Sequence, residues 1–148
     1  MKPILTYNFG TWGLTKAEEE TLNRVHRKQL RILGRWFGTS NKKLYELCNE
    51  KELSTEMKKA RWRLFGHVLR LPLDAPCQKA MTWYFEVPLY PTKFKGRART
   101  TLPTTLCEDI KSRKGKLPFT QFRTLADLDM LRSIASMKET WKKVVDVM

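Results

Sequence analysis

The chain has 148 residues, of which 41% are hydrophobic, and it carries 29 lysines and arginines against 15 acidic residues, a net charge of +14. This composition excludes a wholly disordered chain, and no apolar run approaches the ~20 residues that a bilayer-spanning helix needs. The positive excess favours a polyanionic partner, with nucleic acid first and an anionic membrane surface second.

The N-terminal stretch, residues 1–14, has no clear secondary-structure pattern. Its start, MKPILTYNFG, lacks a long apolar core and a small-residue cleavage site, so we expect no signal peptide. The letters PILTY fit either a short strand or the tail of a truncated helix, and we interpret residues 1–14 as the end of an upstream domain. Three widely spaced cysteines predict free thiols in a reducing compartment, the nucleus or the cytoplasm; they are Cys48, Cys77 and Cys107.

The first predicted helix starts at Thr15, because TKAE is a capping box with Glu18 three residues after the cap. It ends at Gly34 or Gly38. Helical spacing predicts an apolar face that also holds His26, which we interpret as a core histidine. The apolar face comprises Leu22, Val25, Gln29, Leu30, Ile32 and Leu33, and the opposite, basic face comprises Arg24, Arg27, Lys28 and Arg31.

Two more helices are predicted before Pro72. A short one follows Ser40, and a longer one is capped by Ser54 and runs to about Leu71. The short helix is expected to bury Leu44, Leu47 and Cys48. On the longer helix a wide apolar arc leaves only a narrow polar strip. The strip consists of Lys59, Arg63, Gly66 and Arg70.

The pair Gly66–His67 lies inside this longer helix, in the stretch RWRLFGHVLR. A glycine in a helix interior costs about 1 kcal/mol relative to alanine, so we expect a close approach by another backbone to compensate. The neighbour is either a second helix or a phosphate, and the sequence leaves both alternatives open. His67 lies at the border of the strip, and we interpret it as a boundary residue because no partner that would orient it for acid–base catalysis is near in sequence.

The second half of the chain predicts further helices and one arm. A helix capped by Asp74 is followed by a basic arm at residues 86–101, where two prolines and a glycine interrupt the pattern. Helix resumes near Thr101 and ends near Lys114, and a last helix starts near Thr124. The helix after Asp74 carries Ala80, Met81 and Trp83, and the last helix carries a stripe of Met130, Ile134, Met137, Trp141, Val144 and Val145.

The predicted fold class is all-α, because no run of useful length alternates with period two. We expect an irregular bundle of about five to six helices, with residues 1–148 as a single helical domain and 86–101 as its arm.

Motifs for autonomous chemistry are missing from the sequence. The two histidines and three cysteines form no CxxC and no HxxxH pair, so we expect no metal site. There is no GxxxxGK[ST] loop and no G-x-S-x-G elbow. We therefore predict no cofactor, no small-molecule substrate and no catalytic residue.

The basic residues recur on several predicted elements and alternate with aromatic residues in the arm, a pattern that suits phosphate pairing with base stacking. No base-reading motif accompanies them, so backbone contacts with little sequence preference are expected. The predicted nucleic-acid-binding residues are Arg27, Arg31, Lys59, Arg63, Gly66, His67, Arg70, Lys93, Lys95, Arg97 and Arg99.

Several stretches, in conserved order, resemble the region that follows the polymerase core in non-LTR (LINE-type) retrotransposon reverse transcriptases. RWRLFGHVLRLP is similar to an R-x-R-x-x-G-H-V-x-R-M signature, LNRVHRKQLRILGRW to the preceding L-x-x-x-x-R-x-x-L-R-x-I-L-G helix, and KGRARTTLPTTLCEDIK to G-R-P-x-x-T-W-x-x-x-x-x-x-D-L. ILTYNFGTWGLT, SNKKLYEL and IASMKETWKKVV resemble further segments, so that the resemblance covers nearly the whole chain.

The resemblance implies a thumb-to-linker helical segment that helps to hold template and primer. It implies no polymerase activity for this chain, because the Tyr/Phe-x-Asp-Asp motif of the family is not in the sequence. The sequence departs from the family pattern at Ala98, where proline is expected, and at Met137–Lys138, where Asp-Arg is expected. The residues that the resemblance marks as structural or nucleic-acid-contacting are Arg61, Arg63, Gly66, His67, Arg70, Gly96 and Arg97.

Three functions therefore remain as hypotheses. The first is a non-catalytic helical segment that binds RNA or DNA, alongside a missing upstream polymerase domain and without a membrane partner. The second is a helical protein-interaction scaffold that uses the stripe of the last helix. The third is a non-functional remnant of a transposon reading frame.

Overall fold

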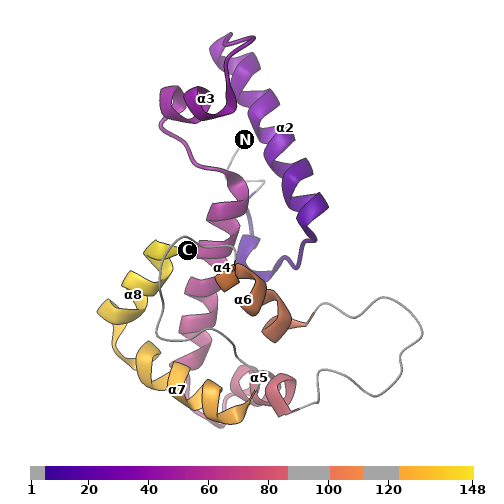
Figure 1. Cartoon of the computed structure of the whole chain (residues 1–148). Coiled ribbons are helices and arrows are strands. Elements are labelled where there is room, and N and C mark those ends of the chain that lie inside the picture. Colours follow the sequence, from indigo (N-terminus) through magenta and orange to yellow (C-terminus); the bar gives the residue numbers. More distant parts are fainter. Residues whose placement is uncertain (1–5, 87–100, 112–123) are drawn as a thin grey trace, which may run out of the picture. The chain divides into compact units, whose positions relative to one another are not determined.

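The computed structural model describes residues 6–86, 101–111 and 124–148 (Figure 1). Over these ranges the chain is all-α, as predicted, with seven α-helices, one 3-10 helix and no strand. By its internal contacts the chain divides into two compact units, Met1–Arg61 and Trp62–Met148, and the boundary falls inside helix α4.

The first unit contains the 3-10 helix η1 (Phe9–Thr11), α2 (Lys16–Gly34), α3 (Asn41–Cys48) and the first part of α4 (Leu53–Leu69). The predicted start of α2 is confirmed: the Glu18 backbone N–H donates to the Thr15 hydroxyl, and the Glu18 carboxylate accepts from the Thr15 backbone N–H at 2.7 Å. The helix ends at Gly34, the earlier of the two predicted positions.

The predicted faces of α2 are wrong in part. Ile32 and Leu33 are exposed, Leu33 by 80%, whereas Arg27 from the predicted basic face is 8% exposed. The reason is the position of the neighbouring elements, because α3 packs on α2 and the start of α4 bonds to Asn23, so the contacted side is that of Asn23, His26 and Arg27. Burial of His26 agrees with its interpretation as a core histidine.

The start of α4 is fixed by a side chain from α2 instead of by Ser54, the predicted cap. Helix α4 already begins at Leu53. The Ser54 backbone N–H donates to Asn23 Oδ1 at 3.1 Å, and Asn23 Nδ2 donates to Ser54 Oγ at 2.9 Å. Asn23 therefore satisfies one of the donors that a helix N-terminus leaves open.

Residues 6–14, predicted as the end of an upstream domain, pack inside the first unit. Phe9 is buried together with Leu53 and Met57. Arg61 Nη2 donates to the Trp12 carbonyl oxygen at 2.7 Å, so this arginine of the RWR signature has a structural contact. The letters PILTY begin outside the described residues, and η1 follows them.

The prediction for α3 is confirmed at its cap and at one of its apolar positions. Ser40 is the N-cap, and its hydroxyl accepts from the Lys43 backbone N–H. Leu44 is fully buried and Cys48 is half-buried, but Leu47 is 48% exposed, because only one side of this short helix is covered. Cys48, Cys77 and Cys107 are free thiols.

The second unit contains the rest of α4, α5 (Pro76–Glu86), α6 (Leu102–Lys111), α7 (Leu125–Ser136) and α8 (Lys138–Val147). Helix α5 begins with a proline in its first position, where the missing N–H costs nothing. The basic arm and the predicted helix end near Lys114 lie outside the described residues, apart from Glu86 and Thr101 at the ends of the arm.

The single last helix that the sequence predicts is two helices. Its start is confirmed, because Thr124 and Asp127 form a capping box. The helix stops at Ser136, however, and Met137 has extended backbone angles. Of the predicted stripe, Met130 and Met137 are exposed, whereas Trp141, Val144 and Val145 are buried. The buried residues of α7 are Leu128, Leu131 and Ala135.

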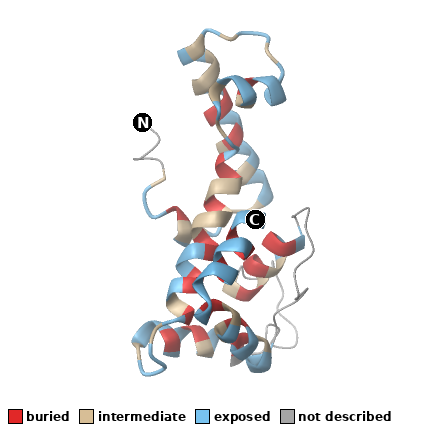
Figure 2. Cartoon of the chain, turned by 90° about the vertical axis from the view of Figure 1, so that its left-hand side faces the viewer, coloured by how far each residue is buried: buried red, intermediate tan, exposed pale blue. Residues whose placement is uncertain are grey.

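Large aromatic side chains form the centre of the second unit. Trp62, Phe65 and Trp141 are buried in mutual ring contact, with centroid separations of 5.8 to 6.0 Å. The Trp62 indole N–H donates to Asp109 Oδ2 at 3.2 Å, which ties α4 to α6. Figure 2 shows the buried residues as stripes along the helices, with exposed residues on their outer sides.

Candidate nucleic-acid interface

Gly66 is the point at which α8 packs against α4. The glycine is buried, and a Cβ placed on it would overlap the indole of Trp141. The same indole N–H donates to the Trp62 carbonyl oxygen at 3.0 Å. Of the two alternatives for Gly66, the structure therefore has the helix contact, and no surface remains at this residue for a phosphate. The prediction that Gly66 contacts nucleic acid is corrected accordingly.

The two helices run in opposite directions at this contact. Trp141 lies against Trp62 and Gly66, while Arg70, the residue that follows α4, reaches the Ala135 carbonyl in the last turn of α7, just before α8 begins. Figure 1 shows α8 beside the second part of α4 with its C-terminal end toward the α4 midpoint. The missing side chain at Gly66 leaves room for the Trp141 indole against α4.

This geometry places basic residues of both helices on one side of the pair. At 100° per residue, Arg63 and His67 lie about 60° and 100° round from Gly66, and Arg70 is the first residue after α4. Lys138 and Lys142 lie about 60° to 100° round from Trp141 in the same rotational sense. Because the helices are antiparallel, equal senses of rotation point to the same side. We call the surface formed by Arg63, His67, Arg70, Lys138 and Lys142 the cationic ridge.

The side chains of the cationic ridge are available to a ligand. All five residues are exposed. Across the part of the chain that the structure describes, four of them make no side-chain hydrogen bond or ion pair, and the exception is Arg70. Arg70 Nη1 donates to the Ala135 carbonyl at 3.2 Å, which occupies one of the five donors of the guanidinium. This contact also satisfies a carbonyl in the last turn of α7.

The carboxylates of α8 border the ridge. Glu139 and Asp146 lie about 140° to 160° round from Trp141, three and four residues from Lys142. The second-unit part of α4, residues 62–69, has no acidic residue. Basic side chains therefore outnumber acidic ones on this side of the pair, and the arginines and lysines can donate hydrogen bonds to phosphate oxygens.

Two predicted binding residues of α2 are engaged inside the first unit. Arg27 pairs with Glu20 at 2.5 Å, and this hydrogen bond raises the pKa of Arg27 above its usual value. Burial in turn raises the pKa of the neighbouring Tyr45. Arg31 donates to Asn41 Oδ1 at 2.7 Å and to the Thr39 carbonyl at 3.0 Å. Arg31 thus ties α2 to the start of α3, and Arg27 is paired within α2, so the proposed interface leaves both arginines out.

The remaining predicted residues fall outside the ridge for other reasons. Lys59 belongs to the first unit and is half-buried. The arm residues Lys93, Lys95, Arg97 and Arg99 lie outside the described residues, as does Gly96. Arg63, His67 and Arg70 are thus the predicted residues that the structure brings together.

Lys138 and Lys142 are the ridge residues that the sequence prediction missed. Their spacing of four residues places them on one side of a helix, which is a signal available in sequence. Their relation to Arg63 depended on the break at Met137 and on the direction of α8, neither of which has a local sequence marker.

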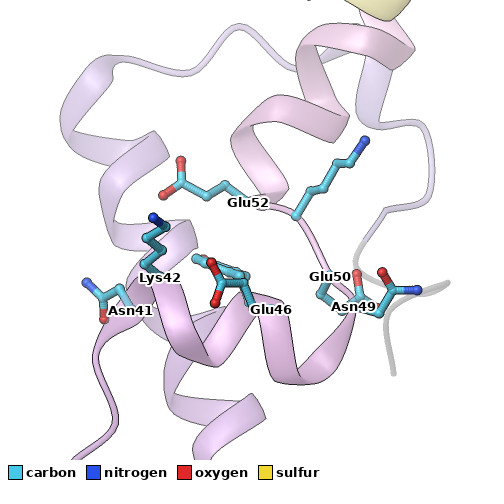
Figure 3. Close-up of a pocket in the computed structure, with 8 residues that line it drawn as sticks. Asn41, Lys42, Glu46, Asn49, Glu50 and Glu52 are labelled. Atoms are coloured by element: carbon cyan, nitrogen blue, oxygen red, sulfur yellow. The ribbon is translucent and has the colours of Figure 1, made fainter.

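The first unit has a hollow of about 520 Å³ beside α3 and the connection to α4 (Figure 3). Its charged lining residues are Lys42, Glu46, Glu50, Lys51 and Glu52. Carboxylates outnumber amines here, so the hollow is poorly suited to a phosphate group.

Among the described residues, no cluster of three or more His, Cys, Asp or Glu side chains has the arrangement of a metal site. None of the helices described combines the length and apolarity needed to cross a membrane. Comparison of the chain with family models, curated proteins and solved structures finds no match.

Proposed function

We propose that the chain is a non-catalytic nucleic-acid-binding segment that contacts the phosphate backbone of RNA or DNA through the cationic ridge. The observation that carries the proposal is the set of exposed basic side chains from the end of α4 and from α8, four of which make no side-chain hydrogen bond or ion pair in the described residues. A net charge of +14 supports it, because each phosphate neutralised by a lysine or arginine releases condensed counterions.

The sequence resemblance adds a setting to this proposal. The stretch RWRLFGHVLRLP is the most specific part of the resemblance to LINE-type reverse transcriptases. It supplies three of the five ridge residues, Arg63, His67 and Arg70. In that setting the segment holds template or primer for an upstream polymerase domain, in the nucleus or the cytoplasm. The ridge has no base-reading arrangement, so contacts to the backbone without strong sequence preference are proposed.

Equilibrium binding of the full chain to fluorescein-labelled RNA and DNA hairpins of unrelated sequence tests the proposal. Binding at low salt is expected for every sequence, with an affinity that falls steeply as the salt concentration rises. A folded sample that binds none of the hairpins at low salt overturns it.

A second function, as a protein-interaction module, is favoured by α2. Its side opposite the first-unit contacts exposes Val25 and Ile32, and Leu33 is exposed near the C-terminal end of the helix. The last-helix stripe first considered for this role is not free, because Trp141, Val144 and Val145 are buried. The resemblance offers one occupant for α2, the polymerase domain that precedes this region in the family. Light scattering separates the functions, since a stable oligomer indifferent to polyanions favours the interaction module.

A further inference from the structure

Helix α5 carries an exposed pair of aromatic side chains. The exposed fractions are 58% for Trp83 and 45% for Tyr84, and their ring centroids are 5.3 Å apart at an interplanar angle of 71°. The other aromatic residues described in the second unit, Trp62, Phe65, Phe85 and Trp141, are buried. The core therefore does not use this pair, and the edge-to-face arrangement leaves indole surface open to solvent.

The other side of α5 is held rigidly, so that the pair is fixed in place. Gln78 is buried, and its Nε2 donates to the Val68 carbonyl at 2.6 Å. Arg132 Nη2 of α7 donates to Gln78 Oε1 and to Thr82 Oγ1, both at 3.0 Å. A platform on an anchored helix loses little conformational freedom when a ligand binds.

A lysine beside the pair suits an anionic ligand. Lys79 lies one turn before Trp83 on the same side of α5, and the other charged residue of this helix is Glu86, its last residue. Lys79 is exposed and, in the described part of the molecule, has no ion pair. An open indole face beside a free ammonium is the combination that binds an unpaired base together with its phosphate.

We propose that Trp83, Tyr84 and Lys79 form a stacking platform for the unpaired bases of single-stranded RNA or DNA. The proposal rests on the proposed function and extends it to a ligand class, because the cationic ridge alone does not distinguish single strands from duplexes. Bases within a duplex are stacked on each other and cannot reach the platform.

The test compares the affinity of the full chain for a labelled single strand of about 15 thymidine nucleotides and for a duplex of the same length. Trp83→Leu is expected to weaken single-strand binding about five-fold or more, because five-fold is roughly the lower limit for the loss of one stacked base. Its effect on duplex binding is expected to be less than about two-fold, because a duplex has no unpaired base to stack. Trp83→Phe, which keeps a stacking ring, restores most of the affinity. Quenching of tryptophan emission by the single strand is expected in the wild type and mostly lost in Trp83→Leu.

Leu73→Ala is the matched control, because Leu73 is another exposed apolar residue of the second unit. Unchanged circular dichroism and Tm show that each variant is folded. Equal single-strand affinity of Trp83→Leu and the wild type overturns the platform, as does an equal loss for single strand and duplex; the first result points to a protein ligand for this pair. Neither result affects the proposed function, which fails only if the wild type binds neither nucleic acid.

Discussion

At the scale of single residues, Gly66 shows how a pattern that suggests chemistry can serve packing. The Gly66–His67 pair lies in the most specific stretch of the resemblance, yet the space beside Gly66 is filled by the Trp141 indole from α8. His67 is exposed beside it and belongs to the cationic ridge. The glycine thus serves packing, because it allows the contact between Trp141 and α4.

Gly66→Ala is expected to destabilise the second unit by about 1–3 kcal/mol, because the new methyl overlaps a fully packed indole. At a glycine in an open helix position, the same substitution to alanine stabilises the protein by about 1 kcal/mol. Denaturant unfolding followed by tryptophan fluorescence measures the difference. Trp141→Leu in the same chain should remove most of the penalty, while Arg63→Ala, an exposed change on the same helix, should stay within about 0.5 kcal/mol of the wild type. A more stable Gly66→Ala protein contradicts the packing role.

At the scale of elements, α4 depends on a side chain distant in sequence. Asn23 exchanges two hydrogen bonds with Ser54, and both residues are buried. Asn23→Ala is expected to lower the free energy of unfolding of the first unit by about 1–2 kcal/mol, because the helix loses its cap. Asn23→Asp keeps the acceptor and places a negative charge at the positive end of α4, so it should recover part of the loss. Equal destabilisation by both substitutions, measured in urea, contradicts the capping role.

The elements that the sequence predicted well are those whose boundaries depend on nearby residues. The caps at Thr15, Ser40 and Thr124 involve partners three residues away, and all three are present. The cap supplied by Asn23 lies 31 residues from Ser54, beyond any local pattern. The break at Met137 has neither glycine nor proline, and its backbone there is extended.

The faces of helices were harder to predict than their existence. Periodicity in α2 shows an apolar side but does not say where neighbouring elements lie, and the contacted side is the one with Asn23, His26 and Arg27. The candidate site has the same limit, because Arg63 and Arg70 could be selected from one helix but Lys138 and Lys142 needed the α4–α8 contact. Local spacing thus predicted the α4 half of the ridge, and tertiary packing determined the other half.

At the scale of the whole molecule, the two units differ in the size of their apolar cores. In the described residues the first unit buries a small cluster around Phe9, Leu53 and Met57, and the second buries a much larger one around Trp62 and Trp141. Amide hydrogen exchange in low denaturant is expected to show lower opening free energies for α3 than for α7, because less apolar area stabilises α3. Identical opening free energies for both helices contradict two separate units.

The cationic ridge is proposed to neutralise nucleic-acid phosphates. The variant Arg63→Gln/Lys138→Gln/Lys142→Gln removes three ridge charges and spares Arg70, which contacts α7. The matched control, Lys16→Gln/Lys42→Gln/Lys43→Gln, removes the same charge from exposed lysines of the first unit. Both variants have the same net charge, so they differ only in where the charge is lost.

The most direct measurement is the slope of log K against log salt concentration for duplex DNA binding by the wild type and the two variants. The ridge variant is expected to bind weakly, with a slope less steep by about 2.7, or about 0.9 for each lost phosphate contact, while the control slope stays near that of the wild type. Equal slopes and affinities for the two variants would contradict the account, because binding would then depend on net charge and not on the ridge.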